Sequence, residues 1–126
     1  MPARNLPPSH RVVLVMEDQS LLRMDTVDML ERAGFGVVEA ATTADAIAIL
    51  ETRPDIRLVV ADVDMPGGED GIVFAAVIRR RWPPIGIIVL SNLREAQLSE
   101  LPVRARYLSK PFAPERLVAA INQMAP

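Results

Sequence analysis

The chain alternates short runs of apolar residues with longer segments in which apolar residues recur every three or four positions. The apolar runs lie at residues 12–16, 36–40, 56–61, 85–90 and 103–108. The first, third and fourth are apolar almost throughout, which is typical of strands that are covered on both faces of a sheet. Each run is followed by a segment that can form a helix. This repeated order predicts an α/β fold with parallel strands and right-handed crossovers.

The segments between the runs predict five amphipathic helices, at residues 20–33, 42–52, 70–82, 93–101 and 114–124. The helix at 93–101 has the weakest periodicity of the five. Leu22 falls on the apolar side of the first helix, and Val73 is expected to face inward with Phe74 in the third. Gly34 ends the first helix, and Pro114 begins the last, where its missing N–H costs nothing.

Length and composition describe one globular domain. Of the 126 residues, 50% are hydrophobic and 24% are charged, and the net charge is −2. This balance gives no general attraction to nucleic acid or to an anionic membrane. No apolar run approaches the roughly 18 residues that span a bilayer. We therefore expect a cytoplasmic domain at residues 11–126, preceded by a flexible leader at residues 1–10.

Polar residues stand at the ends of four of the five predicted strands. Glu17 and Asp18 follow the first, Asp62 the third, Ser91 the fourth and Lys110 the fifth. In open α/β sheets, ligands bind at the carboxyl ends of parallel strands, where the strand order reverses. The pattern therefore predicts one site that combines three acids, a hydroxyl and an ammonium group.

Such a site suits a divalent cation and a phosphoryl group. Carboxylates at adjacent strand ends repel one another unless a cation joins them. The chain has no cysteine, and its one histidine, His10, lies in the leader, so hard oxygen ligands favour Mg²⁺. Asp62 could attack a phosphoryl group, and Lys110 could take up part of the added charge. For Asp18 taken alone, a simple helix cap is an alternative.

Together these motifs resemble a response-regulator receiver domain of bacterial two-component signalling, of the single-domain type. The matching segments are Glu17-Asp18, Asp62-Val63-Asp64-Met65-Pro66-Gly67, Ser91 and Tyr107-Leu108-Ser109-Lys110-Pro111-Phe112. The resemblance extends from residue 11 to about residue 124. It implies a doubly wound, flavodoxin-like (βα)5 fold with five parallel strands in the order 2-1-3-4-5.

The resemblance also implies a role for each site residue. Asp62 would accept a phosphoryl group from a histidine kinase or a histidine phosphotransfer protein, in a two-component system or a phosphorelay. Asp18 and Asp62 would bind Mg²⁺ directly, Glu17 through water, and Asp64 through its backbone carbonyl. Lys110 would contact the phosphoryl oxygens.

Ser91 and Tyr107 would form the switch that reads phosphorylation. Ser91 would move toward the phosphoryl group and Tyr107 would turn inward behind it. This movement would remodel the face formed by residues 93–101, the fifth strand and the last helix, and so change the binding of an unknown downstream protein. The chain would not be an enzyme beyond its own phosphorylation and dephosphorylation. It would act as a monomer or weak dimer, without nucleic acid or membrane.

Three residues depart from the usual family pattern or bear on how long the phosphoryl group persists. Asn92 stands where a small residue is usual, and its amide could either narrow access to the site or bond the phosphoryl group. Asp64 could repel anionic donors unless it points outward or orients water. Leu93 offers no polar group that positions water, so slow self-dephosphorylation is expected.

Two other functions are compatible with parts of the pattern. A binding scaffold that ignores phosphate could share the fold, although a scaffold has no need to place like charges together. A Mg²⁺-dependent phosphatase with an aspartyl-phosphate intermediate could share Asp62 and Lys110. Its nucleophile would follow the first strand rather than the third, and its substrate-enclosing cap has no counterpart in this sequence.

Overall fold

A computed structural model describes residues 11–62, 69–92 and 104–124 of the chain. Its centre is a parallel sheet of five strands: β1 (Val12–Met16), β2 (Gly36–Ala40), β3 (Ile56–Asp62), β4 (Gly86–Ser91) and β5 (Ala105–Ser109). Their order across the sheet is β2-β1-β3-β4-β5. The fold class and the strand order predicted from the sequence are therefore confirmed. The predicted leader and the predicted helix at 93–101 lie outside the described residues.

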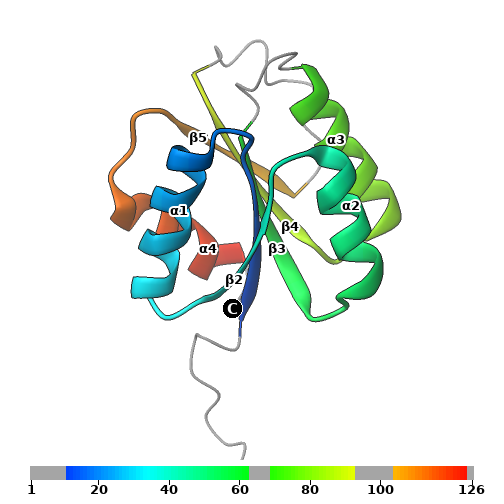
Figure 1. Ribbon diagram of the computed structural model, residues 1–126, viewed down its shortest axis with the longest axis horizontal. Coiled ribbons are helices and arrows are strands. Elements are labelled where there is room, and N and C mark those ends of the chain that lie inside the picture. The colour runs from blue at the N-terminus through cyan, green and yellow to red at the C-terminus, as the bar shows by residue number, and fades with distance from the viewer. Residues whose placement is uncertain (1–10, 63–68, 93–103, 125–126) are drawn as a thin grey trace, which may run out of the picture.

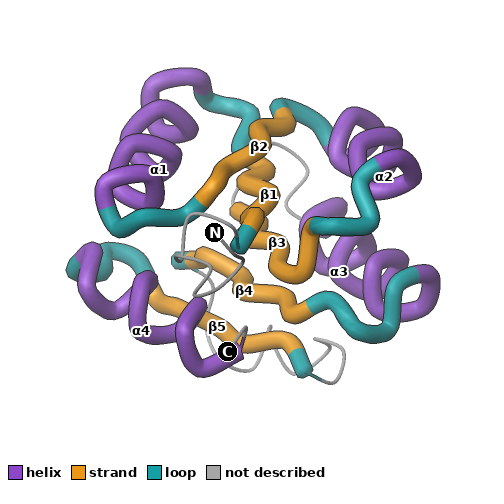
Figure 2. Tube along the Cα trace, turned by 90° about the horizontal axis from the view of Figure 1, so that it is seen from below, coloured by secondary structure: helices purple, strands orange, loops and turns teal. Residues whose placement is uncertain are grey.

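The described residues also form the helices α1 (Ser20–Arg32), α2 (Thr43–Thr52), α3 (Glu69–Arg81) and α4 (Pro114–Met124). Helices α1 and α4 cover one face of the sheet, and α2 and α3 cover the other (Figures 1 and 2). No helix in this part of the chain is both long enough and apolar enough to cross a membrane.

The two helix layers explain why the strands are apolar throughout. Side chains of a strand alternate between the faces of its sheet. In β1, Val13 and Val15 pack in the cluster that contains Leu30 of α1, whereas Leu14 and Met16 pack in the cluster on the opposite face. Both faces of the strand are therefore buried under helices.

Individual residues determine where α1 ends, where α2 begins and how closely α4 packs on β4. Gly34 follows α1 with a φ of 97°, a conformation that favours glycine. The hydroxyl of Thr42 accepts a hydrogen bond of 3.0 Å from the backbone N–H of Asp45 and caps α2. At Gly86, an added Cβ would lie 3.4 Å from Cε of Met124. The absence of a side chain there lets α4 pack closely on β4.

Two apolar helix residues are exposed, and for Val73 the expected face was wrong. Val73 was expected to face inward but is 59% exposed, because Phe74 and Ile78 define the buried side of α3 and Val73 lies on the other. Leu22 lies on the expected apolar side of α1 but is 43% exposed. It belongs to the first turn of the helix, where α1 begins at the carboxyl edge of the sheet (Figure 1).

Candidate functional site

The carboxyl edge of the sheet holds the buried polar side chains found in the described ranges. Among the described residues, the buried polar or charged ones are Glu17, Asp62 and Ser91, which are 6%, 3% and 0% exposed. Asp62 ends β3, Ser91 ends β4, and Glu17 directly follows β1. Burying a polar or charged group costs free energy unless it is paired. All three are predicted site residues, and their burial makes this edge the candidate functional site.

Lys110 joins the site through an ion pair with Asp62. The Nζ atom of Lys110 lies 2.9 Å from Oδ2 of Asp62, and the lysine side chain is 22% exposed. The backbone N–H of Lys110 donates a hydrogen bond of 3.0 Å to the carbonyl of Ser91. The Lys110–Pro111 peptide bond is cis. The end of β5 is therefore tied to the end of β4, with the ammonium group held against the buried carboxylate.

Glu17 interacts with both Asp62 and Asp18. Burial raises the pKa of Glu17 from 4.5 to about 8, and its hydrogen bonding with Asp62 and Asp18 adds to the rise. The backbone N–H of Gln19 donates a 3.0 Å hydrogen bond to Oε2 of Glu17. This bond lowers the pKa of Glu17 and so opposes part of the rise. Lys110 is the positive charge paired with Asp62, while Glu17 and Asp18 add further negative charge. A proton on Glu17 therefore reduces the repulsion among these carboxylates.

The remaining predicted residues occupy more open positions. Asp18 is exposed, and the N-cap of α1 is Gln19, so Asp18 is not the helix cap. Asn92 is exposed beside Ser91, and Tyr107 is half-buried on β5, opposite Val89 of β4. Asp64 and Leu93 lie outside the described residues.

The chemistry of the donors fits Mg²⁺, although the geometry alone does not define a metal site. Within the described ranges, no group of three or more His, Cys, Asp or Glu side chains is arranged to hold a metal ion. The predicted ligand set includes the carbonyl of Asp64, which those ranges leave out. Glu17, Asp18 and Asp62 nevertheless offer the hard oxygen atoms that Mg²⁺ prefers. A cation there would take the place of the proton that Glu17 holds.

The sequence analysis missed a residue beneath the site. Nη1 of Arg23, in α1, donates a 2.9 Å hydrogen bond to the backbone carbonyl of Glu17. Its Nε atom lies 3.0 Å from Oε1 of Glu39 on β2. One signal was present in the sequence, because an arginine at the end of the first turn of the helix that follows an acid pair can reach back to that pair.

Comparison with known proteins decides the family. The family model described as "Response regulator receiver domain" matches residues 13–122 of the chain. The chain belongs to this family. The resemblance to a receiver domain seen in the sequence is confirmed, whereas the single-domain type stays a prediction. Receiver domains are parts of two-component systems and interact with histidine kinases and phosphotransfer proteins.

Relatives of this receiver domain include whole signalling proteins that are longer. It is 40% identical over 121 residues to the transcriptional regulatory protein PdtaR of Mycobacterium tuberculosis, covering 89% of the chain and 55% of PdtaR. It is 34% identical over 116 residues to the sensor kinase CckA of Brucella abortus, covering 89% of the chain and 12% of CckA. The chain thus spans about half of one relative and about an eighth of the other.

Solved structures share the fold. A response regulator receiver protein from Sinorhizobium medicae superposes with a TM-score of 0.80 at 29% identity, covering 90% of this chain and 93% of that one. A two-component response regulator with a GGDEF domain gives a TM-score of 0.80 at 32% identity, covering 93% of this chain and 50% of that one.

The pKa of Glu17 predicts how stability depends on pH without Mg²⁺. Between pH 4.5 and about 8 the folded receiver domain keeps a proton on Glu17 that the unfolded chain has lost. The folded state then binds more protons, so the free energy of unfolding falls as pH rises through this range. Glu17→Gln should flatten this fall and raise stability at pH 8 by roughly 1 to 3 kcal/mol. Urea denaturation in EDTA from pH 5 to 8 measures the free energy of unfolding of the wild type and of Glu17→Gln.

The prediction requires the two pH profiles to differ. Parallel profiles for wild type and Glu17→Gln would show that Glu17 titrates normally. Saturating Mg²⁺ should also reduce the fall in the free energy of unfolding of the wild type between pH 5 and 8, since a cation stabilises the ionised form of Glu17.

Proposed function

We propose that Asp62 accepts a phosphoryl group from a phosphohistidine of a histidine kinase or a histidine phosphotransfer protein, in a Mg²⁺-dependent reaction. The observation that carries this proposal is the buried carboxylate of Asp62 with Nζ of Lys110 at 2.9 Å. Glu17 and Ser91 are buried at the same edge. The arrangement offers one nucleophile and one fixed positive charge, which is what transfer to a carboxylate requires.

The transfer exchanges one bond to phosphorus for another. A carboxylate oxygen of Asp62 attacks the phosphorus atom, an O–P bond forms, and the N–P bond of the phosphohistidine breaks. The imidazole nitrogen leaves with the electron pair of that bond. Lys110 holds its ammonium group against the phosphoryl oxygens. Asp18 and Asp62 would hold Mg²⁺ directly and Glu17 would hold it through water, and the cation would supply positive charge against the phosphoryl oxygens.

The response passes through the ends of β4 and β5. Ser91 is fully buried, and its carbonyl accepts a hydrogen bond from the backbone N–H of Lys110. A phosphoryl group on Asp62 gives the hydroxyl of Ser91 a strong acceptor. Movement of Ser91 makes room for Tyr107 on the neighbouring strand to turn inward. The altered surface of β5 and α4 then selects the downstream protein.

Phosphorylation can be tested by intact-mass spectrometry with acetyl phosphate and Mg²⁺. The wild type should gain one phosphoryl group, and EDTA should abolish the gain. Asp62→Asn should gain none, because an amide is a poor nucleophile toward phosphorus. Asp55→Asn serves as the matched control, since Asp55 is exposed and paired with Arg53 on the surface.

An adduct of equal size on Asp62→Asn would place the acceptor elsewhere and contradict the proposal. A wild type that gains no phosphoryl group from acetyl phosphate or from any histidine kinase, and binds no Mg²⁺, would point to the phosphate-independent scaffold.

The phosphodonor must reach Asp62 across the edge where α1 begins. The first turns of α1 expose the apolar side chains of Leu21, which is 74% exposed, and Met24, which is 61% exposed. Two large exposed apolar side chains at the start of the helix that follows the acid pair offer a contact for the protein that carries the donor histidine. We propose that they contribute to docking of the phosphodonor protein.

Docking and chemistry can be separated with two phosphodonors. Met24→Glu should slow phosphorylation by a histidine kinase or phosphotransfer protein that modifies the wild type, by about tenfold, which is about 1.4 kcal/mol. It should leave phosphorylation by acetyl phosphate unchanged, because the small donor needs no docking surface. Val73→Glu is the control, as Val73 is 59% exposed on α3, across the sheet. Equal rates for Met24→Glu and Val73→Glu with the protein donor would contradict this role.

A further inference from the structure

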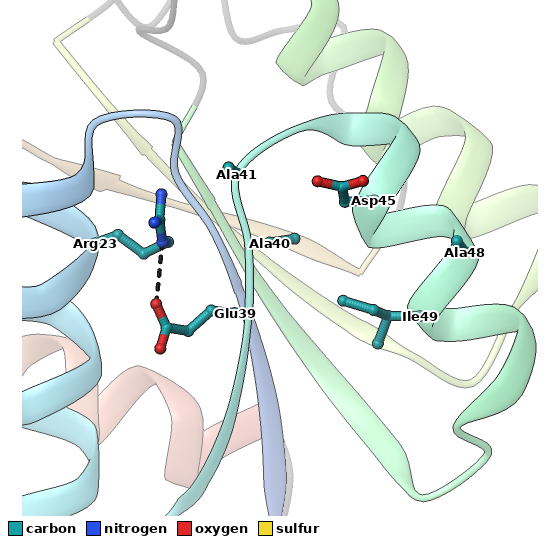
Figure 3. Close-up of a pocket in the computed structure, with 7 residues that line it drawn as sticks. All are labelled: Arg23, Glu39, Ala40, Ala41, Asp45, Ala48 and Ile49. Atoms are coloured by element: carbon teal, nitrogen blue, oxygen red, sulfur yellow. Dashed lines mark hydrogen bonds and ion pairs between the residues drawn. The ribbon is translucent and has the colours of Figure 1, made fainter.

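Arg23 connects three elements of the fold just below the acid edge. Its Nη1 atom donates a hydrogen bond of 2.9 Å to the backbone carbonyl of Glu17, and its Nε atom lies 3.0 Å from Oε1 of Glu39. Figure 3 shows the side chains of Arg23 and Glu39 pointing toward each other from α1 and β2. The side chain of Arg23 is 19% exposed and that of Glu39 is 48% exposed. The guanidinium group is thus largely covered and has two defined acceptors.

The backbone of Glu17 is held from both sides. Its N–H donates a 3.0 Å hydrogen bond to the carbonyl of Ala40 at the end of β2. Its carbonyl accepts the bond from Arg23. The backbone N–H of Arg23 itself donates to the carbonyl of Gln19 at 2.9 Å. The peptide before Glu17 is therefore held by β2, and the peptide that links Glu17 to Asp18 is held through its carbonyl by Arg23 of α1.

The orientation of the Glu17–Asp18 peptide matters because the side chains of Glu17 and Asp18 start from its two ends. A cation that needs octahedral geometry tolerates little error in where its ligands stand. Groups that orient ligands without touching the metal commonly change metal affinity 10- to 100-fold when they are removed.

The charge of Arg23 needs its own partner. A guanidinium group this close to the acid pair would repel a divalent cation and compete for the same carboxylates. The ion pair with Glu39 offsets that charge and holds the guanidinium on the β2 side. Arginine suits this position because Nε and Nη1 of its rigid planar fork point at two separate acceptors, whereas lysine offers a compact ammonium on a flexible stem.

We propose that Arg23 is a positioning residue for the cation site: it fixes the Glu17–Asp18 peptide, and Glu39 neutralises its charge. This inference rests on the proposed binding of Mg²⁺ at Glu17, Asp18 and Asp62. It adds to that proposal a pair of residues outside the ligand set that sets the affinity for the cation.

The test is a double variant that leaves the net charge unchanged. Removing Arg23 alone would also remove a positive charge, which by itself favours a cation. Arg23→Met combined with Glu39→Gln deletes both charges and the hydrogen bond to Glu17. Isothermal titration calorimetry with MgCl₂ should show an affinity at least tenfold below that of the wild type. Arg23→Lys should also lose affinity, since a compact ammonium on a flexible stem does not reproduce the fixed spacing of Nε and Nη1.

A matched control exists on the same helix. Arg32 and Asp28 form an ion pair whose side chains are 79% and 62% exposed. Arg32→Met combined with Asp28→Asn makes the same kind of change away from the acid edge, and Mg²⁺ affinity should remain that of the wild type. The ¹³C chemical shift of the Glu17 carbonyl, recorded without Mg²⁺, should move in the Arg23 variants and stay fixed in the control.

The outcomes separate the two claims. Wild-type affinity and an unmoved Glu17 carbonyl shift in the double variant would overturn the positioning role while leaving the Mg²⁺ site intact. A wild type that binds no Mg²⁺ would instead overturn the proposed site, and the positioning role with it. Circular dichroism reports whether the double variant folds. If it does not fold, the affinity and carbonyl shift of Arg23→Lys decide the question.

Discussion

The site depends on the pairing of one buried carboxylate with one lysine while further carboxylates stand beside it. Asp62 is buried at the end of β3, and Lys110 approaches it at 2.9 Å from the end of β5. Glu17 adds a second buried acid, whose pKa rises to about 8 because burial and Asp62 both disfavour its ionised form. The edge therefore has a surplus of negative charge that a proton or a cation must balance.

The parallel sheet makes this concentration of charge possible. The order β2-β1-β3-β4-β5 brings the carboxyl ends of β1, β3, β4 and β5 together at one edge. Packing on both faces, by α1 and α4 and by α2 and α3, makes the sheet rigid enough to hold unfavourable groups in place (Figure 2). The hydrogen bond from Lys110 N–H to the Ser91 carbonyl couples the acid site to the strand end where the switch is proposed.

The sequence predicted the fold, and it predicted for physical reasons which polar residues lie at the carboxyl edge of the sheet. Continuous apolar strands identify a sheet covered on both faces, and polar residues at the strand ends must then meet at one edge. The interactions of Arg23 could not be predicted in this way. They depend on the direction of a long side chain toward a backbone carbonyl and toward Glu39, which is distant in the sequence. The exposure of Val73 was also missed, since the third helix has more apolar residues than its buried side can hold.

The most direct test of the account is the structure of the protein with Mg²⁺ and beryllofluoride, an analogue of a phosphoryl group. The account predicts beryllium bonded to a carboxylate oxygen of Asp62, with Nζ of Lys110 moved from that carboxylate to a fluoride. It also predicts Mg²⁺ bound by Asp18 and Asp62. Density for the analogue elsewhere, or an Asp62–Lys110 pair unchanged at saturating beryllofluoride and Mg²⁺, would contradict the claim that this edge is a phosphoryl acceptor.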